Sequence, residues 1–196
     1  PAAGPGLALT DLTPSVTETS VVYSAVSLEI DRDKRVATLT VTGPEGDQPE
    51  TAHAIQALGD GFWPLRAFRE LDDALLRLRV NEPLVGTVVI KTRGNQDAML
   101  AMDKLLLESR DHWLVREIIH FMKRTLKRLD LTSRSFFALV EPGSCFAGTL
   151  CELALAADRS YMLDAPDQPN TIALSGMNNG PLPMSNALTR LQTRFL

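Results

Sequence analysis

The sequence predicts an α/β fold in which helices pack over a mostly parallel sheet. Two short apolar runs, Val85–Ile90 and Phe136–Val140, are typical of strands buried on both faces. Between them lies an amphipathic helical stretch, Asp111–Leu129, with apolar residues at spacings of three and four. Strands that alternate with helices in this way are joined by parallel crossovers. We therefore expect at least two such crossovers.

The other elements follow from periodicity and from turn residues. Alternating apolar residues predict strands over Val26–Ile30 and Val36–Val41, and the polar residues between them predict a hairpin. Apolar residues recur at helical spacing over Pro64–Val80, and Asn81-Glu82-Pro83 ends this helix. Further expected elements are a short helix over 49–58, a helix over 98–107, a loop and then a helix over 143–157, and strands over 160–163 and 171–174.

The first residues differ in composition from the rest of the chain. Residues 1–21 are rich in Pro, Gly, Thr and Ser and show no periodicity, which predicts a linker or an extended arm. Residues 22–196 are expected to form one domain. The chain begins at Pro1 without Met and ends at Arg194-Phe195-Leu196, so we expect a fragment of a longer protein, although a processed start would also lack Met.

Composition excludes several classes of protein. The 196 residues carry 20 Lys+Arg and 24 Asp+Glu, a net charge of −4, which is unlike a dedicated nucleic-acid binder. Hydrophobic residues make up 44%, too many for a disordered chain. Two cysteines are too few for a disulfide framework or a four-ligand zinc site. With no signal peptide or membrane-spanning stretch, we expect a cytoplasmic protein without nucleic-acid or membrane partners and without metal or other cofactors.

Chemistry is most strongly indicated where the Phe136–Val140 strand runs through a loop of small residues into a helix. Such a loop directs several backbone N–H groups toward one place, where they can hold a phosphate or an oxyanion. The carboxylate of Glu152 in the first turn could then move a proton. The alternative is structural, because Thr149-Leu-Cys-Glu152 also fits a capping box.

The residues Ala147-Gly-Thr-Leu-Cys-Glu-Leu-Ala-Leu-Ala-Ala-Asp158 resemble the crotonase (enoyl-CoA hydratase/isomerase) superfamily. In that family a strand, a glycine loop and a helix form half of the oxyanion hole for an acyl-CoA thioester. The resemblance extends to Arg35–Pro44, which matches the opening strand pair, and to Phe68–Thr92, which matches a helix and a central strand. It implies a crotonase-type spiral of strand–strand–helix units with a small, mostly parallel sheet.

A longer set of motifs is similar to the ring-opening lyases of that superfamily. The match runs from Val22 to the C-terminus and is to the later of two crotonase-like halves. It implies an intact enzyme that hydrolytically opens the ring of 2,3-epoxybenzoyl-CoA and releases formate in aerobic benzoate degradation. The implied partners are the CoA thioester, the N-terminal half and further copies in a homo-oligomer. The motifs are Trp63-Pro-Leu-Arg, Arg69-Glu-Leu-Asp-Asp-Ala, Arg124-Thr-Leu-Lys-Arg-Leu-Asp, Thr132-Ser-Arg-Ser and Glu141-Pro-Gly-Ser-Cys-Phe-Ala-Gly-Thr.

Two of the three catalytic motifs of those lyases are missing here. The loop Lys91–Asp97 lacks the family's Cys/Ala-Gly-Ala-Asp/Asn, and Ala173-Leu-Ser-Gly176 stands where a second glutamate would be. Only Glu152 matches a catalytic position. We therefore expect a non-catalytic half that supports its catalytic partner, with Glu152 as a cap and a vestige. The oxyanion loop would be formed by Gly148, Thr149 and Cys145.

Two other functions stay open. The chain could be a stand-alone acyl-CoA hydratase or isomerase that uses Glu152 with Asp97 or Glu141 as its partner. It could instead be an anion-binding module, since a basic helix face could receive CoA phosphates, although such a face usually lies in water. The basic residues are Lys123, Arg124, Lys127, Arg128 and Arg134.

Cys145 has two interpretations as well. It lies close to a helix N-terminus, which lowers a thiol pKa and could produce a nucleophile. A free cysteine is more commonly a small, buried packing residue. We therefore favour the interpretation that Cys145 packs beneath the loop.

Overall fold

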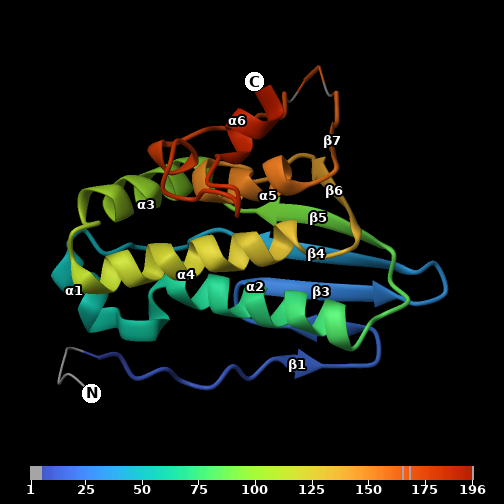
Figure 1. Ribbon diagram of the computed structural model, residues 1–196, viewed down its shortest axis with the longest axis horizontal. Coiled ribbons are helices and arrows are strands. Elements are labelled where there is room, and N and C mark those ends of the chain that lie inside the picture. The colour runs from blue at the N-terminus through green and yellow to red at the C-terminus, as the bar shows by residue number, and fades with distance from the viewer. Residues whose placement is uncertain (1–5, 165, 168, 196) are drawn as a thin grey trace.

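A computed structural model describes residues 6–164, 166–167 and 169–195, which form a single seven-stranded sheet with helices beside it (Figure 1). The strands are β1 (Ser15–Val16), β2 (Ser20–Val22), β3 (Val26–Asp31), β4 (Val36–Thr42), β5 (Thr87–Arg93), β6 (Ser135–Val140) and β7 (Arg159–Met162). The α-helices are α1 (Ala52–Leu58), α2 (Trp63–Val80), α3 (Gln96–Glu108), α4 (Trp113–Asp130), α5 (Cys151–Ala156) and α6 (Arg190–Phe195). Three short 3-10 helices are η1 (Gly59–Gly61), η2 (Gly148–Leu150) and η3 (Gly176–Asn178).

The strands lie side by side in the order β1 to β7. Strands β1 to β4 pair antiparallel, and the expected hairpin is confirmed with Val26 opposite Val41 and Ile30 opposite Ala37. Strands β4 to β7 pair parallel through crossovers that contain the helices. The α/β class is therefore confirmed. The antiparallel share of the sheet is larger than expected, because β1 and β2 extend it.

Helices α2 and α4 lie across one face of the sheet (Figure 1). Along β4 and β5 the side chains alternate strictly between buried and partly exposed positions. The buried set includes Leu39 and Ile90, both 0% exposed, which face the helices. Burial of each such side chain contributes about 1.5–3 kcal/mol. One hydrophobic core therefore lies between the sheet and the helix layer.

Polar contacts fix the helix layer in place. Helix α2 begins at Trp63, whose indole N–H donates to the carbonyl of Thr42 at the end of β4 over 3.0 Å. Arg128 of α4 pairs with Asp72 of α2 over 2.6 Å. Among the helices of the described ranges, none is long and apolar enough to span a membrane.

Residues 6–21 are more ordered than the sequence predicts, and residues 1–5 of the expected arm lie outside the described residues. The expected arm over residues 1–21 contains β1 and part of β2, so its boundary falls inside a strand. These strands have two and three residues, too few for alternation to be visible in the sequence. Upstream, the Thr10 N–H and hydroxyl donate to Asp60, which also pairs with Arg69. The assignment of 22–196 to one domain stays a prediction.

The expected strand over 171–174 is wrong. Only one isolated parallel bridge forms there, between Ala147 and Ala173. Ser175 then caps η3, because its hydroxyl accepts from the Met177 N–H and the Asn178 side chain accepts from the Ser175 N–H. The capping contacts turn the chain away from the sheet after a single bridge.

Replacement of a buried strand residue tests the position of the core. Leu39→Ala should lower the free energy of unfolding by about 2–5 kcal/mol, because it leaves a cavity between sheet and helices. The matched control is Leu84→Ala, since Leu84 is 68% exposed. Urea unfolding measures both variants. Equal losses would contradict the described core.

Candidate functional site

The loop after β6 runs into η2 and then α5, as the sequence predicted. The Cys145 N–H donates to the Thr92 hydroxyl of β5 over 3.0 Å, which ties the loop to the sheet. Glu141, at the start of the loop, pairs with Lys91 over 3.1 Å and also with Arg93. The segment is therefore held at the carboxyl ends of the parallel strands, where α/β proteins commonly bind ligands.

The backbone N–H groups at the start of η2 are already bonded within the chain. The Gly148 N–H donates to the Ala173 carbonyl over 2.9 Å. The Thr149 N–H donates to Asp103 Oδ2 over 2.7 Å, and the Thr149 hydroxyl donates to Asp103 Oδ1 over 2.6 Å. The Asp103 carboxylate thus lies where these groups would hold an external anion.

Gly148 permits this close approach. Its φ of +49° is in the left-handed region, and a Cβ added there would lie 2.0 Å from Asp103 Oδ2. Replacement of Gly148 by any other residue would therefore displace the Asp103 carboxylate and also strain the backbone.

Asp103 is fully buried on α3. Burial raises the pKa of its carboxyl from 3.8 to about 6, although donated hydrogen bonds from Ser175 and Thr149 oppose the rise. The Ser175 hydroxyl donates to Oδ2 over 2.6 Å. Asp103 therefore joins three segments that are distant in sequence: α3, η2 and the chain that precedes η3.

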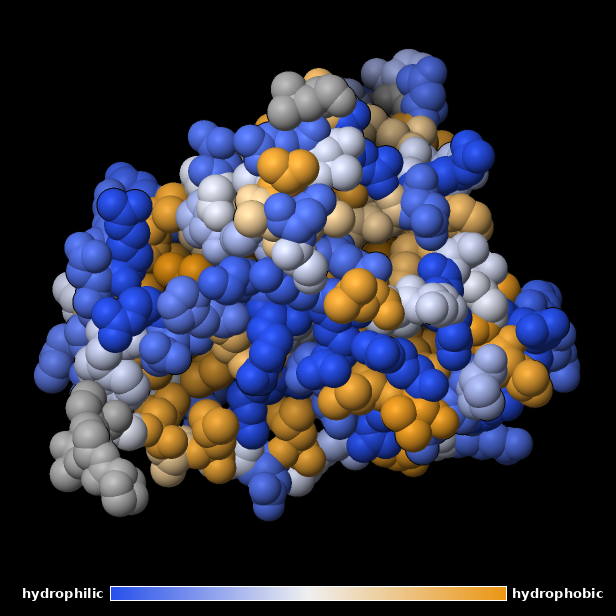
Figure 2. Space-filling view, in the orientation of Figure 1, coloured by the Kyte–Doolittle hydropathy of each residue, from blue (hydrophilic) through white to orange (hydrophobic). Residues whose placement is uncertain are grey.

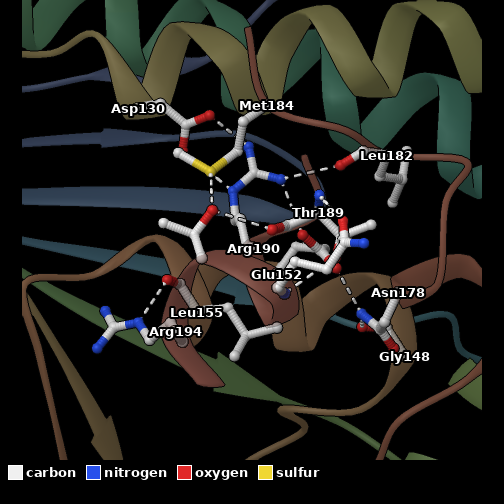
Figure 3. Close-up of polar contacts among 12 residues, drawn as sticks. Asp130, Gly148, Glu152, Leu155, Asn178, Leu182, Met184, Thr189, Arg190 and Arg194 are labelled. Atoms are coloured by element: carbon white, nitrogen blue, oxygen red, sulfur yellow. Dashed lines mark hydrogen bonds and ion pairs between the residues drawn. The ribbon is translucent and has the colours of Figure 1, made fainter. Parts of the chain in front are cut away.

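Glu152 lies on α5 and is 1% exposed. Asn178 donates to its Oε1 over 2.7 Å, and Arg190 donates to its Oε2 over 2.8 Å (Figure 3). Arg190 is also 1% exposed and pairs with Asp130 over 2.6 Å. Burial raises the pKa of Glu152, while Asn178 and Arg190 act in the opposite direction. Both carboxylate oxygens are therefore bonded within the chain.

The expected capping box at Thr149 and Glu152 is wrong. The Thr149 hydroxyl bonds to Asp103, and the Glu152 carboxylate bonds to Asn178 and Arg190. Neither side chain accepts a hydrogen bond from the backbone N–H groups at the start of the helix, because both bond to buried side chains instead. A capping box does form at Ser175 and Asn178.

Cys145 is a packed residue rather than an activated thiol. It is 0% exposed, and burial raises its pKa to about 11, with the charge of Asp103 adding to the rise. Its Sγ lies 3.5 Å from the Asn95 carbonyl. The lowered pKa that a helix N-terminus could produce is therefore absent, because burial and a like charge act more strongly.

The expected basic set does not act as one cluster. Arg128 pairs with Asp72, while Arg134 donates to backbone carbonyls. Lys123 lies 3.1 Å from His120, and Arg124 lies over the ring of Phe121. Lys127 is partly exposed. Contacts of Lys123, Arg124 and Lys127 with CoA phosphates stay a prediction.

The two carboxylates suggested as partners of Glu152 in a stand-alone enzyme have other surroundings. Glu141 is engaged by Lys91 and Arg93, and Asp97 is an exposed residue in the first turn of α3. The hydrogen bonds of Glu152 within the described ranges go to Asn178 and Arg190 instead.

Three residues of this site were missed in the sequence: Asp103, Asn178 and Arg190. Asp103 did leave a signal, because it shares a helix face with Met99, Met102 and Leu106, which are all buried. A charged residue at an apolar position of that pattern indicates a buried partner. Arg190 and Asn178 lie in irregular sequence with no periodicity that would indicate their burial.

One cavity of the described residues lies away from these groups. It has a volume of about 690 Å³ and lies between the N-terminal segment and helices α2 and α4, where Leu9, Leu76 and Phe121 line it. Figure 2 shows hydrophobic side chains gathered along the lower part of this face and hydrophilic ones across its middle. Neither Asp103 nor Glu152 lines this cavity.

A solved structure with a TM-score above 0.5 supports the fold. Pseudomonas aeruginosa DspI superposes with a TM-score of 0.53 at 14% identity, over 82% of this chain and 55% of that one. An enoyl-CoA hydratase from Bacillus halodurans gives a TM-score of 0.46 at 15% identity, over 71% of this chain and 50% of that one. No family model matches the chain. The architecture is the crotonase-type α/β fold that the sequence predicted.

One curated protein is similar along the whole chain. Benzoyl-CoA-dihydrodiol lyase from Aromatoleum evansii is 49% identical over 195 residues, which is 100% of this chain and 35% of that protein. The chain therefore spans about a third of the relative's length. The resemblance to a lyase that the sequence indicates is confirmed.

Removal of Arg190 tests the buried charge network. Arg190→Met should lower the free energy of unfolding by about 3–5 kcal/mol, because Glu152 and Asp130 lose their buried counter-charge. Lys104→Met is the control, since Lys104 forms an exposed pair with Glu108 and should change stability little. Chemical denaturation measures both. A loss for Arg190→Met no larger than that of the control would contradict the network.

The raised pKa of Asp103 predicts how the free energy of unfolding varies with pH. Its folded pKa of about 6 lies above the ordinary 3.8, so the folded chain binds this proton more tightly than the unfolded chain does. The stabilisation is fully present below about pH 4 and is lost as the pH rises through about 6. A shift of about 2 pKa units corresponds to about 3 kcal/mol.

The comparison variant is Asp103→Asn, which cannot titrate at this position. Between pH 4 and 6.5 the stability of the natural chain should fall relative to that of the variant. Urea unfolding across this range measures the difference. Parallel curves would show that Asp103 does not titrate as described.

Proposed function

We propose that this chain is a degenerate crotonase-like half of a ring-opening lyase that resembles benzoyl-CoA-dihydrodiol lyase. The observation that carries the proposal is 49% identity to that protein along the whole chain. In the intact enzyme the reaction would be the hydrolytic opening of 2,3-epoxybenzoyl-CoA with release of formate. This half would supply a scaffold and an interface for the catalytic half.

The bonding of the amide groups supports an inactive state. An oxyanion hole works when N–H donors are directed at the oxygen that becomes charged, and loss of one donor reduces the rate by about 10²–10³. The Thr149 N–H donates to Asp103, and the Gly148 N–H donates to Ala173. A thioester oxygen would have to displace an internal carboxylate from the first donor.

The state of Glu152 supports the same conclusion. A general acid or base must come within hydrogen-bond distance of the proton that it moves. Glu152 is 1% exposed and bonded through both oxygens, to Asn178 and Arg190. Its carboxylate therefore stabilises the junction of α5 with the C-terminal segment instead of facing a substrate.

Turnover by the isolated chain tests the proposal. The 196-residue chain, mixed with 2,3-epoxybenzoyl-CoA, should release no formate above the uncatalysed rate, because its amide donors and Glu152 are engaged internally. Coupled formate detection measures the rate. Calorimetry with benzoyl-CoA should likewise show no micromolar binding. Formate release that is lost in Glu152→Gln and retained in the exposed control Glu117→Gln would establish a stand-alone enzyme instead.

A further inference from the structure

The cavity of about 690 Å³ between the N-terminal segment and helices α2 and α4 is separate from the site around Asp103 and Glu152. Its N-terminal wall runs beside α2 (Figure 1) and is held there by polar contacts. Arg69 of α2 donates to the Thr10 carbonyl over 2.5 Å, and the Thr10 N–H donates to Asp60 over 2.6 Å. The cavity is therefore bounded by three parts of the chain that are fastened to one another.

The lining of this cavity is mainly apolar, and part of it is exposed to solvent. Leu9 is 57% exposed and Leu76 is 37% exposed, and both line the cavity together with Leu12, Trp113 and Phe121. Apolar surface that a ligand removes from water contributes favourably to binding. The volume lies within the range of about 300–1,000 Å³ that is usual for small-molecule sites. The lining therefore suits a small ligand with an apolar body.

The charged residues that line the cavity leave one cation without a partner. Arg124 forms no ion pair with another described residue. Its guanidinium carbon lies 4.8 Å from the centre of the Phe121 ring, which holds the charge at the cavity wall. An anionic group is the electrostatic complement of this guanidinium. The other charged lining residues have ionic neighbours: Arg69 with Asp60, Asp72 with Arg128, Asp73 with Arg77 and Glu117 with Arg116.

The lining is elongated along α4. Trp113 and Arg124 both line the cavity and are separated along this helix by about 16 Å, given a rise of about 1.5 Å per residue. A ligand that reaches both ends is a chain rather than a compact ring. Leu76 of α2 and Leu9 of the N-terminal segment supply aliphatic surface for it. The shape therefore favours an alkyl chain.

We propose that this cavity binds a medium-chain alkyl carboxylate, with the carboxylate at Arg124 and the alkyl chain directed along Leu76 toward Trp113. The guanidinium fork matches the two oxygens of a carboxylate. Glu117 lies one helical turn from Trp113, so the reverse orientation would place two carboxylates close together. This binding goes beyond the proposed ring-opening reaction, because it concerns a free acid and a different part of the fold.

Calorimetry of the 196-residue chain with octanoate and decanoate, both below their micelle concentrations, tests the proposal. Burial of each CH₂ group strengthens binding about threefold to fourfold. Decanoate should therefore bind about tenfold more tightly than octanoate, at one saturable site. A chain that binds neither acid, or that binds both with equal affinity, would overturn the proposal.

Tryptophan fluorescence locates the ligand. Trp113 lines the cavity, whereas Trp63 is 5% exposed and lies outside the lining. Decanoate should change the tryptophan emission of the natural chain. In Trp113→Phe that change should disappear while calorimetry still shows binding, because phenylalanine keeps an apolar ring at this position. An emission change that persists in Trp113→Phe would place the ligand elsewhere and contradict the assignment.

Replacement of the cation tests the class of ligand. Arg124→Gln should weaken decanoate binding about tenfold, because the hydrogen bonds to a charged group are lost. It should leave the binding of 1-decanol unchanged, since the alcohol carries no charge. The matched control is Arg116→Gln, which is exposed on the same helix and outside the lining. Equal effects on acid and alcohol, or no effect on either, would show that no carboxylate binds at Arg124.

A charge placed in the apolar lining tests the path of the chain. Leu76→Glu should abolish decanoate binding, whereas Val80→Glu should not, because Val80 is 73% exposed on the same helix and outside the lining. Circular dichroism confirms that both variants fold. Unaltered binding in Leu76→Glu would overturn the proposal.

Coenzyme A without an acyl group separates this site from the CoA phosphate contacts predicted for Arg124. It should leave the affinity for decanoate unchanged, and competition by it would assign Arg124 to phosphate binding instead. None of these measurements uses formate release. Failure of this proposal therefore leaves the proposed function intact, and failure of the proposed function leaves this site intact.

Discussion

The buried carboxylate of Asp103 connects the parts of this structure that define its site. It accepts hydrogen bonds from the backbone and the hydroxyl of Thr149 and from the hydroxyl of Ser175. A buried carboxylate without such donors would be strongly unfavourable. The same donors are those that a crotonase-type loop would otherwise present to a ligand. The hydrogen bonds that compensate the buried Asp103 carboxylate are therefore the same bonds that occupy the amide group of Thr149.

A second network consists of charged side chains that compensate one another. Arg190 and Glu152 are buried and the side chain of Asp130 is 8% exposed, so the charges depend on one another for compensation. Through Arg190 the last helix is fastened to α4 and α5 (Figure 3). Glu152 therefore balances a buried guanidinium and contributes to the packing of α5 against the C-terminal segment.

The two faces of the sheet differ in how far the described residues cover them. One face is closed by α2 and α4, whereas the other exposes residues such as Val89 and Phe137. Since the chain matches about a third of a longer relative, such a surface is consistent with a unit that functions within a larger assembly.

The sequence by itself determined helices α1 to α5, strands β3 to β7 and the α/β class, because these depend on local periodicity. It did not indicate α6, and the strand that it predicted over 171–174 does not form. It also located the loop and helix around Thr149, because strand, small residues and amphipathic helix follow one another directly. Only the tertiary structure decided the roles of Asp103 and Arg190, which meet Thr149 and Glu152 across 46 and 38 residues of chain. Contacts over such separations are set by packing, and no spacing in the sequence encodes them.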